Sequence, residues 1–166
     1  MFCVSLRLFP NRVVKLCFVF VCAVACLFVP AARSFAQRPL ADNAQPLFSD
    51  FKGVRIGMPT EEARKKLGSP RDKGDDQDFY VFNDVEAVQI FYDKASKTVT
   101  AISIDFMNGA TQIPVAKDIL GSEPEAKADG SAYKLVRYPK AGYWVSYSRT
   151  AGNSPTITIT MQKIDR

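Results

Sequence analysis

The chain has 166 residues, of which 22 are basic and 17 acidic, so its formal net charge at pH 7 is +5. The first 36 positions hold four of the basic residues and none of the acidic ones. The remaining 130 residues carry a net charge of only +1, which removes the electrostatic basis for a general affinity for nucleic acid or anionic membranes. A chain of that length can bury roughly two-thirds of its unfolded surface in one core.

The first 36 residues have the pattern of a secretory signal peptide. A basic stretch precedes an uncharged, mostly apolar run over residues 16–32, and the small residues Ser34 and Ala36 predict cleavage before Gln37. The run is at the lower limit of bilayer-spanning length, so an uncleaved anchor is an alternative, and lipidation at Cys26 is a lesser one. We therefore expect an exported protein, periplasmic or secreted, with a membrane-anchored form as the alternative.

Residue types that carry much of enzyme chemistry are missing after position 36. All four cysteines lie before that position, and the chain has no histidine. Ser–His–Asp and Cys–His nucleophile systems are therefore excluded, and zinc, copper and haem sites lose their ordinary ligands. We predict no cofactor, no metal and no enzymatic activity.

Two charged runs are interpreted as solvated. Four aspartates cluster after the first predicted helix, at a spacing that does not fit a calcium-binding loop: Asp72, Asp75, Asp76 and Asp78. Residues 64–66 (RKK) are assigned to the exposed side of that helix.

The chain after residue 50 reads as a tandem repeat. Three segments recur at offsets of 53 to 55 residues: 67–70 as 120–124, 90–93 as 145–148, and 102–104 as 157–159. Repetition at this period indicates two supersecondary units that share one core. We therefore divide the chain into a leader (1–36), a linker or arm (37–50), a first repeat (51–108) and a second repeat (109–166), with 37–166 as one globular domain.

Each repeat is predicted to contain a short helix followed by three strands. In the first helix, Thr60 can act as a cap and Gly68 as a left-handed stop. Period-two alternation of apolar residues predicts strands at 79–82, 87–92 and 98–106, and again at 133–138, 143–148 and 156–163. The predicted fold class is α+β: two tandem helix–three-strand meanders forming one antiparallel sheet of about six strands, with both helices on one face.

A family resemblance rests on two short motifs. Residues 53–58 (GVRIGM) precede a helix with an acidic start, and residues 67–70 (LGSP) follow it before a meander. This arrangement resembles the SmpA/OmlA group of outer-membrane assembly lipoproteins, and the doubled unit resembles the β-lactamase-inhibitory-protein-like fold. The resemblance implies an envelope or secreted domain that acts by binding protein.

The sheet face away from the helices is predicted to carry the function. Trp144 and Phe91 fall among polar residues in the strand alternation, as aromatic anchors of protein interfaces do. Aligning the repeats sets Gln89 against Trp144 and Phe91 against Ser146. The predicted partner-binding residues are Trp144, Phe91, Gln89, Asp105, Ser146 and Thr158. Alternatively, the rings of Trp144 and Phe91 are covered by the N-terminal arm, by a loop, or by each other across the sheet.

The predicted function is that of an exported, non-enzymatic protein-binding module of the cell envelope or secreted space. Its partner would be a protein, not a nucleic acid, and only an uncleaved N-terminal segment would contact a membrane. Inhibition of a secreted or periplasmic enzyme and assistance in an envelope assembly are two specific forms. The alternatives are a purely structural envelope protein and an acid–base hydrolase using Asp93 and Asp105, which the alternation sets on one sheet face.

Overall fold

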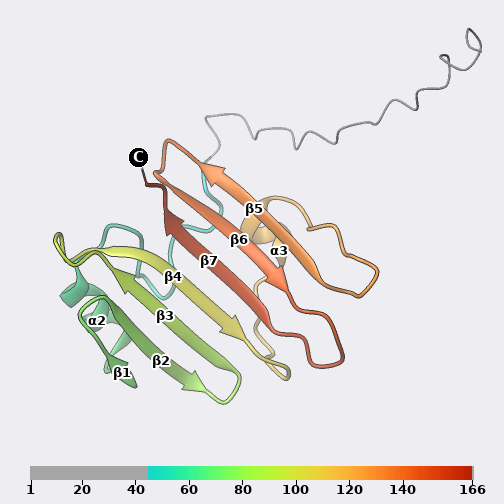
Figure 1. Cartoon of the computed structure of the whole chain (residues 1–166), viewed down its shortest axis with the longest axis horizontal. Helices are drawn as coiled ribbons and strands as arrows, with labels where there is room; N and C mark the ends of the chain where they lie inside the picture. Colours follow the sequence, from blue (N-terminus) through green and yellow to red (C-terminus); the bar gives the residue numbers. More distant parts are fainter. Residues whose placement is uncertain (1–44, 166) are drawn as a thin grey trace, which may run out of the picture. The chain divides into compact units, whose positions relative to one another are not determined.

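The computed structural model describes residues 45–165. The predicted leader (1–36) and most of the predicted arm lie outside the described residues. Seven antiparallel strands form one sheet in the order β1-β2-β3-β4-β7-β6-β5 (Figure 1). The strands are β1 (Asp72–Lys73), β2 (Gln77–Asn83), β3 (Glu86–Tyr92), β4 (Val99–Phe106), β5 (Ala132–Tyr138), β6 (Tyr143–Arg149) and β7 (Ile157–Lys163).

The predicted fold class is wrong, because strands dominate the described chain and the sheet has seven of them. The helices are short: α2 (Thr60–Leu67) has eight residues and α3 (Ala116–Leu120) has five. The additional strand, β1, lies inside the acidic segment that was expected to be a solvated loop. Backbone hydrogen bonds from Arg71 to Phe79 and from Gly74 to Gln77, both 2.8 Å, fold this segment back onto β2. The sequence pattern did not predict β1, because its two residues are exposed at the edge of the sheet and need no apolar side chain.

Two consecutive three-strand groups meet at the centre of the sheet. β2, β3 and β4 pair in chain order on one side, and β5, β6 and β7 do so on the other. The groups join where β4 pairs with β7, with Ser103 opposite Thr160 and Ile104 opposite Ile159. Segments far apart in the sequence thus lie side by side in the middle of the sheet (Figure 1).

The hydrophobic core covers one face of the sheet. Strand residues such as Ile90, Ile102 and Ile159 are fully buried there, and Ile119 of α3 and Ala63 of α2 belong to the same cluster. Figure 1 views the sheet with α3 behind the strands. Because both helices pack into this one cluster, no helix of the described chain covers the opposite face.

The described end of the arm packs on the helix side. Phe48 is partly buried against the core, and its carbonyl oxygen accepts a hydrogen bond from Tyr143 Oη at 3.4 Å. Tyr143 belongs to the core face and Trp144 to the other, because successive side chains of a strand point to opposite faces. Residues 45–50 therefore leave Trp144 uncovered. Within residues 45–165, no helix has the length and apolar character needed to cross a bilayer.

Candidate partner-binding face

The strand register arranges side chains of the uncovered face in three rows across the sheet, and we call these residues the open face. The first row is Gln77, Phe91, Ala101, Gln162, Trp144 and Arg137. The second row is Phe79, Gln89, Ser103, Thr160, Ser146 and Leu135. The third row is Val81, Ala87, Asp105, Thr158, Ser148 and Tyr133.

The middle of the open face is polar and its two flanks are apolar. On β4 and β7, Ser103 Oγ lies 3.3 Å from Thr160 Oγ1, and Thr158 Oγ1 donates to Asp105 Oδ1 at 2.7 Å. The β2–β3 flank carries Phe79, Val81 and Phe91, and the β5–β6 flank carries Tyr133, Leu135 and Trp144. Val81 is 39% exposed and Tyr133 59%. The face thus presents large apolar side chains on both sides of a hydroxyl-rich strip.

The six predicted binding residues all lie on the open face. Trp144 and Phe91 are half-buried; they sit on β6 and β3, three strand spacings or about 14 Å apart, so neither ring covers the other. Gln89 accepts a hydrogen bond from Gln77 Nε2 at 3.3 Å. Ser146 is only 6% exposed, so of the six it offers the least surface to a partner.

The pairing register shows which predicted binding residues share a row of the sheet. Ser103 and Thr160 pair at the centre, and one strand further out Gln89 pairs with Ser103 while Ser146 pairs with Thr160. Gln89 and Ser146 therefore lie in the same row of the sheet. Trp144 lies in the same row as Phe91, at the opposite flank.

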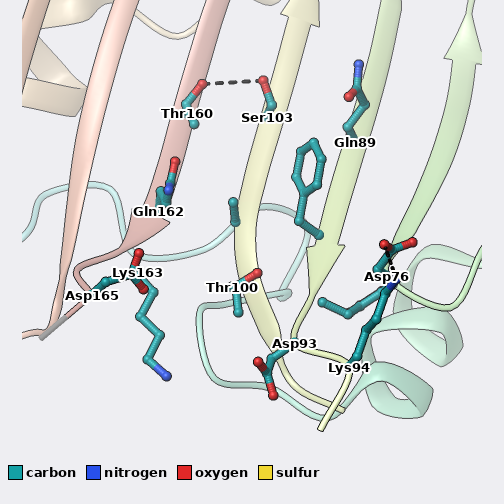
Figure 2. Close-up of a pocket in the computed structure, with 13 residues that line it drawn as sticks. Asp76, Gln89, Asp93, Lys94, Thr100, Ser103, Thr160, Gln162, Lys163 and Asp165 are labelled. Carbon is teal, nitrogen blue, oxygen red and sulfur yellow. Dashed lines mark hydrogen bonds and ion pairs between the residues drawn. The ribbon is translucent and has the colours of Figure 1, made fainter. Parts of the chain in front are cut away.

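A shallow groove of about 770 Å³ lies on the β3–β4–β7 part of the open face (Figure 2). Its floor has small side chains, including Ala101 and Ser103, and its walls include Phe91, Gln89 and Gln162. Its rim is charged: Lys94 Nζ lies 2.8 Å from Asp76 Oδ2, and Asp93, Lys163 and Asp165 complete it. Its lining offers both hydrogen-bonding and apolar groups.

The two aspartates of the hydrolase alternative lie at opposite ends of the sheet. Asp105 is in the row of Ala87 near the start of β3, whereas Asp93 follows the end of that strand. Six residues of strand span about 20 Å, and the carboxyl pairs of glycosidases are less than about 10 Å apart. Asp93 Oδ1 instead accepts the backbone N–H groups of Ser96 and Ala95, at 2.6 and 3.1 Å. These bonds lower the pKa of Asp93.

A buried charge cluster on the helix side was missed by the sequence analysis. Asp78 of β2 is fully buried and pairs with Arg64 of α2, whose Nε lies 2.8 Å from Oδ2 and whose Nη2 lies 3.0 Å from Oδ1. Tyr92 Oη donates to Asp78 Oδ2 at 2.8 Å and Tyr80 Oη does so at 3.4 Å. The sequence had placed Asp78 and Arg64 in charged runs that were interpreted as solvated. The burial of Asp78 could have been predicted, because Asp78 is two residues before Tyr80 in a strand and so lies on the same, core-facing side.

The cluster changes the protonation equilibria of its members. Burial, followed by the charge of Asp78, raises the pKa of Tyr80 to about 12. The pKa of Tyr92 is raised by burial and by its hydrogen bond to Asp78. Burial alone would raise the pKa of Asp78, but the hydrogen bonds from Arg64 and Tyr92 outweigh it and leave that pKa lowered. The aspartate is therefore ionised and its hydrogen-bonding capacity is filled, which makes the cluster a structural link between α2 and the sheet.

No group of three His, Cys, Asp or Glu side chains in residues 45–165 is arranged to hold a metal ion. Comparison with protein-family models, with curated proteins and with solved structures finds no match to this chain.

Proposed function

We propose that this chain is an exported, non-enzymatic module that binds a protein partner through the open face. The observation that carries the proposal is the placement of half-exposed aromatic residues on both flanks of that face, with no described helix or arm over them. Binding energy at protein interfaces is concentrated in a few large side chains, with Trp, Tyr and Arg the most frequent. The open face offers Trp144, Tyr133 and Arg137 within two adjacent strands.

The groove supports one specific form of this function. A hollow between Phe91 and Gln162 would admit a loop that projects from the partner, as an inhibitor of a secreted or periplasmic enzyme requires. Assistance in an envelope assembly is the other form, and the resemblance to the SmpA/OmlA group supports it. Both forms use the same face, so one experiment tests the surface they share.

The test compares open-face variants with a matched variant on the arm. Trp144→Ala and Phe91→Ala should each weaken binding of a partner crosslinked to the native chain, with losses of about 2 kcal/mol or more if they are hot spots. Leu47→Ala removes a side chain that is 62% exposed and belongs to the arm, so it should leave binding unchanged.

Thermal unfolding of the same variants separates binding from folding. Trp144→Ala should change the free energy of unfolding by no more than about 1 kcal/mol, as expected for a partly exposed position. Full binding by Trp144→Ala and Phe91→Ala, or loss of binding only in variants that unfold, would remove the open face as the interface.

A further inference from the structure

The β5–β6 flank of the open face contains a charged residue that forms no ion pair with the other described residues. Arg137 of β5 is exposed and lies directly opposite Trp144 of β6 in the strand register. Side chains in that relation have Cβ atoms about 4.5–5.5 Å apart. Among residues 45–165, the ion pairs are Lys52–Glu86, Arg64–Glu61, Arg64–Asp78 and Lys94–Asp76, so Arg137 takes part in none of them.

On the open face of β5, β6 and β7, the positions around Arg137 are apolar or uncharged. Its own strand adds Leu135 and Tyr133 to the same face, and the open-face positions of β6 and β7 are Trp144 and a set of hydroxyl and amide side chains. Arg137 is therefore the only formally charged residue among the open-face positions of β5, β6 and β7. A guanidinium beside a tryptophan that pairs with no carboxylate of residues 45–165 is suited to a carboxylate brought by another molecule.

β5 is an edge strand of the sheet. Its edge position explains why the strand carries a charged residue, but it does not explain the charge of Arg137. Charged side chains commonly protect sheet edges from unwanted pairing. Lys134 already supplies such a charge on the other phase of β5, where its Nζ is hydrogen-bonded to Ser122 Oγ. Arg137 instead faces the side of the sheet where the aromatic residues lie.

We infer that Arg137 is the specificity-determining residue of the open face, and that it binds an Asp or Glu side chain of the partner protein next to Trp144. This inference rests on the proposed function and adds the chemistry of the partner segment: a carboxylate adjacent to an apolar side chain. The apolar neighbour would pack on Trp144 and Leu135, while the carboxylate would accept two parallel N–H bonds from the guanidinium. Complementary charge in such a pair selects the partner as well as adding affinity.

A displayed library of random peptides tests the inference with a defined probe. The purified whole chain should select peptides enriched in Asp or Glu, and these should bind Arg137→Glu at least about tenfold more weakly than the native chain. Selection repeated on Arg137→Glu should enrich Lys or Arg instead. Arg149→Glu is the matched control, because Arg149 is also exposed and undergoes the same charge reversal, but from the opposite phase of β6.

The outcomes separate this inference from the proposed function. If the selected peptides are neutral or basic but lose binding with Trp144→Ala, the open face is the interface and the role of Arg137 is overturned. Equal weakening by Arg137→Glu and Arg149→Glu also overturns it, since the effect would then be one of net charge. If no peptide is selected, or if the selected peptides bind both Trp144→Ala and Arg137→Glu like the native chain, both proposals fail.

Discussion

Arg64 and Asp78 form a bidentate ion pair that joins α2 to β2 beneath the sheet, with N–O distances of 2.8 and 3.0 Å. The carboxylate has no exposed surface, and the arginine side chain is 16% exposed. The backbone N–H of Gly74 adds a further bond to Asp78 Oδ1 at 3.2 Å. The pair thus fixes a helix, a strand and the turn after β1 relative to one another.

Replacing Arg64 with alanine should lower the free energy of unfolding far more than replacing its neighbour Lys65. Arg64→Ala leaves a buried carboxylate without its counter-charge, which typically costs about 3–5 kcal/mol of unfolding free energy. Lys65→Ala removes an exposed cation from the same helix and should cost no more than about 0.5 kcal/mol. Chemical denaturation of both variants measures the difference, and equal stabilities would show that the pair is dispensable.

Acid should unfold the protein partly through Asp78. Its pKa is lower in the folded chain than its usual value of 3.8, so its contribution is complete above that value and is lost as the pH falls through the folded pKa. Unfolding free energies measured at intervals from pH 5 to pH 2 should fall less steeply in Asp78→Asn than in the native chain. Parallel curves would assign the acid sensitivity to other groups.

Alkali should act on the same cluster through its tyrosines. Because the pKa of Tyr80 is about 12 and that of Tyr92 is also raised above 10, the neutral hydroxyls stabilise the fold fully below pH 10. That contribution is lost as the pH rises from 10 through the folded values, since the unfolded chain ionises first. Tyr92→Phe should flatten the decline of unfolding free energy between pH 10 and 12. An unaltered decline would contradict this.

Asp93 should behave as a turn residue. Its side chain accepts two backbone N–H groups in the loop between β3 and β4, a role that an asparagine can largely keep. We expect Asp93→Asn to remain near native stability and Asp93→Ala to be less stable. Thermal unfolding checks this, and equal stabilities of Asp93→Asn and Asp93→Ala would contradict a role of the side chain in the turn.

Period-two alternation was a good guide to individual strands and a poor guide to how they pair. The alternation predicted a strand at residues 87–92, and its alternate residues Val88, Ile90 and Tyr92 are all in the core. The position of Gln89 relative to Trp144 could not be found from alternation, because the register depends on hairpin loops and on the bulge between Phe91 and Tyr92. For the same reason, alternation alone could not show that Arg137 and Tyr133 lie on the same face beside Trp144. Asp78 was missed because its partner Arg64 is 14 residues away on another element.

The junction of β4 and β7 has a consequence for the order of folding. Ser103 and Thr160, which pair across it, are 57 residues apart in the chain. β7 follows every other strand, so during synthesis β4 remains an unpaired edge until nearly all of the sheet has been made. Closing so long a loop carries an entropic cost before any contact compensates for it, and sheets completed by non-local pairing fold slowly. The centre of the core is therefore completed only when β7 docks, because Ile159 is fully buried there.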